Sequence, residues 1–281
     1  MRENSFAALG PHGFHRIAYT EWGDPANSRV LICVHGLTRN GRDFDHLAAA
    51  LAEGWRVVCP DIAGRGRSDW LAEKDAYGYP QYCADMSALI ARLGAETVAW
   101  VGTSMGGLIG MVMASMPNTP VRRLVLNDIG PFIPKSALER LGQYVGKDPD
   151  FASIEDAATY FAEVYAPFGP LSPDQWRHLA EHSLRRKADG RYELRYDPAL
   201  AAPFQGDALA DVDMWKVWDA VGCPVLALRG AESDLLTAET AAEMQTRGPR
   251  AELREFAGIG HAPALMAGDQ IAAVRDWLAA G

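Results

Sequence analysis

Ser104 lies in the pentapeptide Gly102-Thr103-Ser104-Met105-Gly106, which matches the pattern G-x-S-x-G. The residues before it, 97–101, form a β-branched, apolar run that predicts a buried strand, and residues 105–115 predict the helix that follows. A serine in such a sharp strand-to-helix turn has a strained backbone and needs small neighbours, which Gly102 and Gly106 supply. The pattern therefore predicts a nucleophile elbow that presents the Ser104 hydroxyl to an acyl group.

A serine hydroxyl is a weak nucleophile unless a base takes its proton. The segment Gly-Ile-Gly-His-Ala-Pro at 258–263 follows a strand predicted at 252–256, so His261 lies in a loop beyond the carboxyl end of that strand. Ligands of parallel sheets bind along this edge, where Ser104 also lies. We therefore expect His261 to be the base.

Two aspartates are candidates for the acid that orients His261. Asp234 follows the strand predicted at 225–229 and a glycine turn, and gives the chain order serine, acid, histidine. Asp128 follows the strand predicted at 123–127 and is the alternative. We favour Asp234 because its loop is better suited to the role. It would accept the imidazole N–H, fix the tautomer and stabilise the imidazolium.

A negatively charged tetrahedral intermediate needs two backbone N–H donors. Met105 supplies one by its position directly after the nucleophile. Leu37, in the segment Val34-His35-Gly36-Leu37 after an apolar strand, is the expected second donor. In such a strand-to-loop pair, His35 is expected to be a hydrogen-bonding brace without a catalytic role.

Two further patterns partly match known motifs, one for phosphate and one for zinc, but we expect neither to be a binding site. The segment Gly64-Arg65-Gly66-Arg67 lacks the third glycine of G-x-G-x-x-G, so it predicts a turn and no phosphate loop. His178 and His182 match the zinc motif H-x-x-E-H. At 100° per residue, however, both fall opposite the apolar face of their helix and are predicted to face solvent. We therefore expect neither a metal site nor a cofactor.

Composition limits the partners. The chain has 281 residues, 48% of them hydrophobic, and a formal net charge of −9, which argues against nucleic acid and anionic membranes as partners. No secretory signal and no apolar run of membrane-spanning length is visible. The four cysteines show no C-x-x-C spacing and lie in apolar runs, which indicates reduced core residues in a cytoplasmic protein: Cys33, Cys59, Cys83 and Cys223.

Strand-like and helical patterns alternate along most of the chain, which predicts a parallel sheet covered on both faces. The break falls at 131–210, where aromatic-rich helices follow one another without intervening buried strands and Ser153 and Ser172 mark helix starts. We therefore expect an α/β core at 1–130 and 211–281 and a helical lid, or cap, at 131–210. Strands are predicted at 15–21, 30–34, 56–59, 97–101, 123–127, 225–229 and 252–256, and helices at 43–52, 80–93, 105–115 and 270–279.

Over essentially its whole length the chain resembles the α/β-hydrolase family, in particular its lidded carboxylesterases, enol-lactonases and carbon-carbon hydrolases. The resemblance implies a mostly parallel eight-stranded sheet with helices on both faces, a helical lid after the sixth strand, no cofactor, and hydrolysis through an acyl-enzyme. Some members carry the acid where Asp128 stands. The resemblance rests on Val34-His35-Gly36, Pro60-Asp61, Gly64 to Ser68, Gly102 to Gly107, Leu228-Arg229-Gly230 with Asp234, and Gly260-His261.

We therefore expect a serine hydrolase that cleaves an ester or lactone of a small, largely apolar molecule. A carbon-carbon hydrolase for ring-fission products, an enol-lactonase and an acyltransferase are the enzymatic alternatives. Carbon-carbon hydrolases of this kind resemble G-N-S-x-G at the elbow, whereas Thr103 stands here in place of the asparagine. The alternative from another class is a ligand-binding protein on the same fold. A homo-oligomer is compatible with the sequence.

Overall fold

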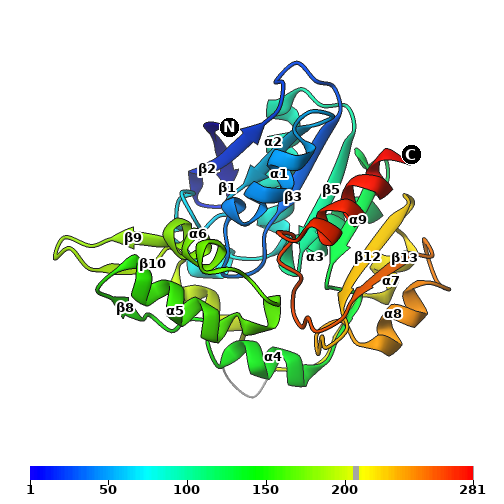
Figure 1. Cartoon of the computed structure of the whole chain (residues 1–281). Coiled ribbons are helices and arrows are strands. Elements are labelled where there is room, and N and C mark those ends of the chain that lie inside the picture. The colour runs from blue at the N-terminus through cyan, green and yellow to red at the C-terminus, as the bar shows by residue number, and fades with distance from the viewer. Residues whose placement is uncertain (205–208, 281) are drawn as a thin grey trace.

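The computed structural model describes residues 1–204 and 209–280 and is built on one eight-stranded sheet (Figure 1). The strand order is β1-β2-β4-β3-β5-β6-β12-β13. Neighbours from β4 to β13 run parallel, whereas β2 runs antiparallel to both of its neighbours, β1 and β4. The expected mostly parallel eight-stranded sheet is thus confirmed. The strands are β1 Arg2–Gly10, β2 Gly13–Trp22, β3 Val30–Val34, β4 Arg56–Pro60, β5 Val98–Thr103, β6 Val121–Asn127, β12 Val225–Gly230 and β13 Glu252–Phe256.

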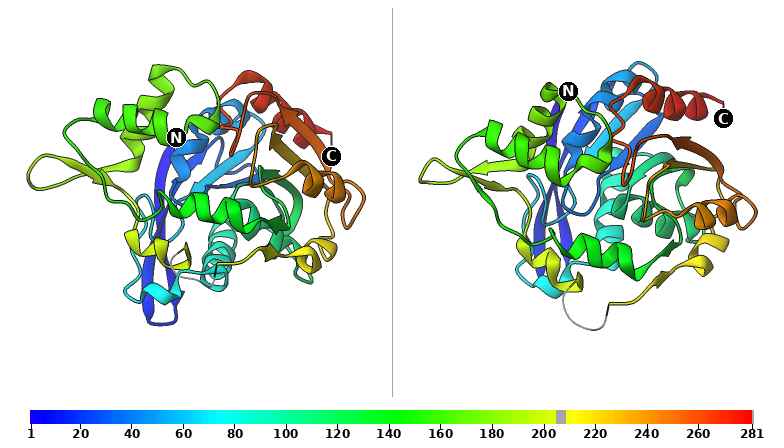
Figure 2. Two further views of the ribbon diagram at one scale, coloured as in Figure 1. Left: turned by 90° about the horizontal axis from the view of Figure 1, so that it is seen from below. Right: turned by 60° about the horizontal axis from the view of Figure 1, so that its bottom comes forward.

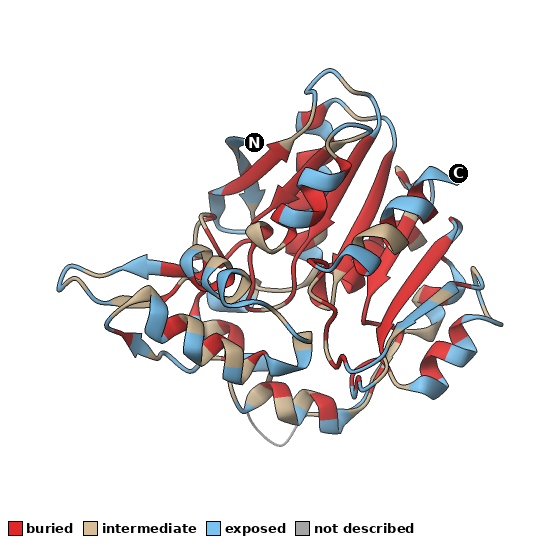
Figure 3. Cartoon of the chain, viewed as in Figure 1, coloured by how far each residue is buried: buried red, intermediate tan, exposed pale blue. Residues whose placement is uncertain are grey.

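Helices cover both faces of this sheet. On one face α1 (Asp45–Leu51) and α9 (Gly268–Ala279) bury apolar side chains against the strands. On the other face α2 (Tyr79–Leu93) and α3 (Met105–Ser115) do the same, beside α7 (Trp215–Asp219) and α8 (Ala238–Met244). The central strands are therefore apolar on both sides, and β3 is buried at every position (Figure 3).

The sequence did not lead us to predict β1. This strand pairs with β2 at the edge of the sheet, in register from Arg2 opposite Glu21 to Gly10 opposite Gly13. Most of its side chains are exposed or half-buried. An edge strand can carry polar residues that a central strand would exclude, so the buried apolar run that indicates a strand is absent here.

Residues 131–204 and 209–210, which we call the insert, lie against one end of the sheet, as the green and yellow-green segments of Figures 1 and 2 show. Ser153 and Ser172 cap α5 and α6 as expected, and Ser172 forms a full capping box with Gln175. Beside these helices, three short strands that the sequence did not lead us to predict form a small separate sheet in the order β8-β10-β9. Each strand is too short to produce a readable pattern. The helices are α4 Lys135–Gly142, α5 Ile154–Val164 and α6 Pro173–Ser183, and the three strands are β8 Asp150–Phe151, β9 Leu184–Arg186 and β10 Tyr192–Leu194.

Polar contacts hold the insert to the loops at this end of the sheet. Gly66 N–H donates to Arg195 O at 2.9 Å, and Asp197 N–H donates to Gly64 O at 2.8 Å. The loop that carries His261 also takes part, because Gly260 N–H donates to Pro167 O at 2.8 Å. The insert thus rests directly on the loops that follow the strands.

Two expectations about the whole chain can be compared with the structure. All four cysteines are free, with Cys33, Cys59 and Cys223 buried and Cys83 half-buried. Among the helices of residues 1–204 and 209–280, none has both the length and the apolar character that a membrane crossing requires.

Candidate active site

Ser104 occupies the turn between β5 and α3, with φ 52° and ψ −118°. This left-handed backbone is rare for a residue with a side chain and is strained. The flanking glycines are required for space: a Cβ at Gly102 would lie 2.3 Å from Gly106 O, and a Cβ at Gly106 would lie 2.0 Å from Val34 O. The structure thus has the predicted elbow, and its two glycines cannot be replaced without moving the backbone.

His261 lies in the loop after β13 and reaches the elbow. Its Nε2 is 3.0 Å from Ser104 Oγ, which is hydrogen-bonding distance for proton transfer between a nucleophile and a base. The His261 side chain is 8% exposed. The structure therefore brings together the two residues that the sequence paired as nucleophile and base.

The carboxylate that contacts His261 is Asp128, and the preference for Asp234 is corrected. Asp128 Oδ2 lies 2.8 Å from His261 Nδ1, and the Asp128 side chain is fully buried. Asp234 is 47% exposed and forms an ion pair with Arg140 of α4, with Arg140 Nη2 to Asp234 Oδ1 at 2.8 Å. Both acids follow strands that end at the same edge of the sheet, but Asp234 is paired with Arg140, whereas Asp128 contacts His261.

Asp128 is held by the loop from which the acid was expected. Its Oδ1 accepts a hydrogen bond from Gly230 N–H at 2.8 Å, and its Oδ2 accepts one from Ser233 Oγ at 2.6 Å. Donors to both oxygens fix the orientation of the carboxylate plane. Asp128 also has a positive φ of 56°, which turns its side chain out of the direction of the strand.

The two expected oxyanion donors lie beside Ser104. Met105 is the first residue of α3, where backbone N–H groups have no carbonyl partner within the helix. Gly36, directly before Leu37, packs against the elbow, since a Cβ on it would lie 3.7 Å from Ser104 Cβ. Leu37, Ser104 and Met105 all line one cavity. The N–H groups of Leu37 and Met105 remain our predicted oxyanion hole.

His35 has the bracing contacts expected of it. Ile62 N–H donates to His35 Nε2 at 2.9 Å, so the ring proton is on Nδ1, which donates to Gly36 O at 2.7 Å. Burial lowers the pKa of this imidazole to about 3. A neutral His35 therefore fixes the loop in front of Leu37 from inside the protein.

Arg65 supports both oxyanion residues, and sequence reasoning missed it because Arg65 was considered only as part of a turn. The side chain is completely buried. Its Nε donates to Leu37 O at 2.8 Å, and its Nη2 lies 3.2 Å from Met105 Sδ. Its Nη1 donates to Tyr82 Oη at 2.9 Å. One rigid guanidinium thus joins the two segments that carry the expected N–H donors.

Asn127 is a second supporting residue that the sequence did not reveal. Its Nδ2 donates to Thr103 Oγ1 at 3.0 Å and to Pro263 O at 2.8 Å. The side chain therefore ties the residue before Ser104 to the loop that carries His261. A polar residue at the end of a buried strand, directly before a candidate acid, was the available signal.

The cavity in front of Ser104 has a volume of about 570 Å³. Most of its wall is apolar, and much of it comes from the insert. A volume of several hundred Å³ with an apolar wall and few polar groups is typical of small-molecule sites. Insert residues in the wall include Leu138, Leu141, Pro203 and Phe204, and core residues include Leu108 and Ile129.

The predicted solvent-facing position of His178 and His182 was wrong. His178 Nε2 lies 3.1 Å from Arg42 O and 3.4 Å from Asp45 Oδ2, and both histidines are half-buried. The helical-face argument assumed that the face opposite Leu179 is exposed. In the folded chain this face rests on the segment that leads into α1.

The family model described as alpha/beta hydrolase fold matches residues 29–265. The chain belongs to this family. A 3-hydroxybutyrate-oligomer hydrolase from Cupriavidus necator is 50% identical to this α/β hydrolase over 94% of the chain and 93% of the relative. A bifunctional esterase/perhydrolase from Acinetobacter calcoaceticus is 35% identical over 87% of the chain and 89% of the relative.

Solved structures agree with this assignment. A crystal structure from Rickettsia typhi superposes on the α/β hydrolase with a TM-score of 0.94, at 34% identity and full coverage of both chains. Together with the relatives, the match confirms the expectation of a serine hydrolase and of esterase-type chemistry.

Proposed function

We propose that this enzyme hydrolyses esters through Ser104, His261 and Asp128. The observation that carries the proposal is the position of His261, with one ring nitrogen on Ser104 Oγ and the other on Asp128. His261 Nε2 takes the Ser104 proton as the oxygen attacks the ester carbonyl, and later gives this proton to the leaving alcohol. Water then attacks the acyl-enzyme while His261 removes its proton, and His261 gives this proton back to Ser104 Oγ as the carboxylic acid leaves.

The oxyanion of each tetrahedral intermediate would be bound by the N–H groups of Leu37 and Met105. Removal of one such donor costs about 10²- to 10³-fold in kcat in other serine hydrolases. Arg65 and His35 act as positioning residues, because they hold the Leu37 loop and do not touch the reacting atoms. Asp128 keeps the proton on Nδ1 of His261, so that Nε2 is free to act as a base.

The substrate class we propose is short oligoesters of hydroxy acids such as 3-hydroxybutyrate. The support is the 50% identity to a 3-hydroxybutyrate-oligomer hydrolase along nearly the whole of both chains. The cavity of about 570 Å³ is of a size to enclose one or two such units beside Ser104. We place the reaction in the cytoplasm, in keeping with four free thiols.

The test is hydrolysis of 3-hydroxybutyrate dimer and trimer, followed as released monomer, beside p-nitrophenyl butyrate. We expect oligomers to be cleaved by the wild type and not by Ser104→Ala, and a phosphonate to label Ser104. Hydrolysis of the p-nitrophenyl ester without oligomer cleavage would refute the substrate class alone. Unchanged turnover in Ser104→Ala would refute the mechanism.

A further inference from the structure

Three side chains able to bind a transition metal meet where the insert rests on the core. They are Asp45 at the start of α1, and His178 and His182 on α6. One ligand atom from each lies within 4.8 Å of those of the other two. None of the three takes part in the proposed ester chemistry, so the cluster has no assigned role.

The geometry suits a small divalent ion. Histidines four residues apart lie on one face of a helix, and their rings are edge-on with centroids 4.6 Å apart. His178 Nε2 and Asp45 Oδ2 are 3.4 Å apart. Two ligands that each bind zinc at about 2.0–2.1 Å in a tetrahedral arrangement are about 3.3–3.4 Å apart. This pair is therefore spaced as two ligands of one ion.

The ligands are shielded from solvent, and one of them gives up a proton when an ion binds. His178 and His182 are half-buried. His178 Nε2 lies 3.1 Å from Arg42 O, where the ring nitrogen is the donor, so an ion at this atom displaces that proton. The Asp45 side chain is only 8% exposed.

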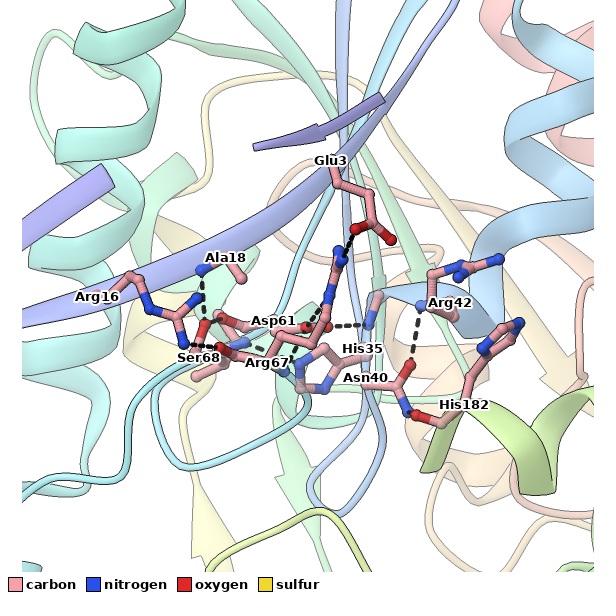
Figure 4. A network of polar contacts seen from close by, with 12 residues as sticks. Glu3, Arg16, Ala18, His35, Asn40, Arg42, Asp61, Arg67, Ser68 and His182 are labelled. Carbon is pink, nitrogen blue, oxygen red and sulfur yellow. Dashed lines mark hydrogen bonds and ion pairs between the residues drawn. The ribbon is translucent and has the colours of Figure 1, made fainter. Parts of the chain in front are cut away.

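Arg42 has two opposite effects on metal binding at this cluster. Its guanidinium holds both oxygens of Asp45, with Nε to Oδ1 at 2.9 Å and to Oδ2 at 2.7 Å, so an ion shares Oδ2 with Arg42 through a second lone pair. Such outer contacts orient ligands, although the positive charge lowers affinity for a cation. Asn40 fixes the helix end: its Oδ1 accepts from Arg42 N–H at 3.0 Å and its Nδ2 donates to His182 O at 3.2 Å (Figure 4).

We propose that Asp45, His178 and His182 form a binding site for one divalent transition-metal ion, such as Zn²⁺ or Co²⁺, that joins α6 of the insert to α1 of the core. Two imidazoles and a carboxylate are typical ligands for these metals. Three protein ligands leave a position for water or an exchangeable group. The ion is a link between insert and core, and it takes no part in ester hydrolysis.

The experiment is a titration of the untagged, metal-free chain with Zn²⁺ by calorimetry and with Co²⁺ by visible absorption. We expect one ion per chain, and a rise in Tm when metal is present. His178→Ala with His182→Ala should abolish the specific binding, and Asp45→Asn should weaken it by at least about tenfold, the lower end of what loss of an outer contact costs. Metal binding that persists in the double variant would overturn the proposal, as would no binding to the wild type.

Two control variants exclude other histidines. His12→Ala removes an exposed histidine far along the chain from the cluster, and His261→Ala removes the proposed base. Both should bind metal like the wild type. Loss of metal binding in His261→Ala would assign the ion to the ester site and refute the site proposed at Asp45, His178 and His182. If the double alanine variant unfolds, judged by circular dichroism, His182→Asn replaces it and should lose at least about tenfold in affinity.

Discussion

Ser233 Oγ donates to Asp128 Oδ2 at 2.6 Å, so the loop after β12 supports the acid without supplying it. The same hydroxyl accepts from Leu236 N–H at 3.1 Å, which closes the loop over the carboxylate. Asp234 follows Ser233 in sequence but points to Arg140 of the insert. Ser233 therefore supports the ester site, whereas its neighbour Asp234 contacts the insert.

Asp128→Asn should lower kcat by about 10⁴-fold, because an amide in contact with His261 Nδ1 favours the wrong tautomer. Asp234→Asn is the matched comparison and should change kcat by less than about tenfold, since it loses only a half-exposed ion pair. Steady-state kinetics with p-nitrophenyl butyrate measures both. A larger loss of kcat in Asp234→Asn than in Asp128→Asn would identify Asp234 as the acid that orients His261.

Ser233→Ala should lower kcat by about tenfold with little change in KM. The reason is the loss of a hydrogen bond to a charged acceptor, which is worth about 1.5–3 kcal/mol, from a group that does not touch substrate. Ser233→Thr retains a hydroxyl and should recover most of the rate. Equal losses in the alanine and threonine variants would show that loop packing, and not the hydrogen bond, is responsible.

Arg65→Lys should reduce kcat by about 10²-fold and leave KM nearly unchanged. Lysine keeps the charge but cannot bridge Leu37 O and Met105 Sδ, so both oxyanion donors lose their support. Arg67→Lys in the same turn is the control, because Arg67 pairs with Glu3 and Asp61 and should affect kcat little. A kcat for Arg65→Lys equal to that of the control would exclude the positioning role.

His35 should make the protein less stable in acid. Its pKa falls from 6.5 to about 3 on burial, so between these values the unfolded chain binds a proton that the folded chain does not. The free energy of unfolding therefore decreases as pH falls through this window, by up to about 1.4 kcal/mol per pH unit. Urea unfolding from pH 7 to pH 4 should show a shallower dependence in His35→Gln, and an unchanged one in His12→Gln. Equal slopes in His35→Gln and wild type would exclude His35 as the titrating group.

Short acyl chains should be preferred over long ones. The cavity of about 570 Å³ is walled partly by the insert and cannot enclose a long acyl chain. The measurement is kcat/KM for p-nitrophenyl esters from acetate to palmitate. A steady rise in kcat/KM toward palmitate would contradict this limit on acyl length.

The elbow, the His261 loop and the seven strands that we predicted are local features, because each is marked by a few neighbouring residues. The choice between Asp128 and Asp234 is different: both acids fit the order along the chain, and only their contacts in the folded chain, Asp128 with His261 and Asp234 with Arg140, distinguish them. Arg65 and Asn127 were missed for the same reason, since each joins segments that are distant in sequence. His178 was misplaced because helical periodicity cannot say which neighbour covers a polar face.

The contact of His261 with Ser104 spans 157 residues, and its contact with Asp128 spans 133. Contacts this distant carry a loop-closure cost, and both need the C-terminal segment that carries His261. A chain emerging from the ribosome would present the serine long before its base exists. Covalent labelling of Ser104 by a phosphonate would therefore report completed folding of each molecule, and could time the arrival of the C-terminal strand during synthesis.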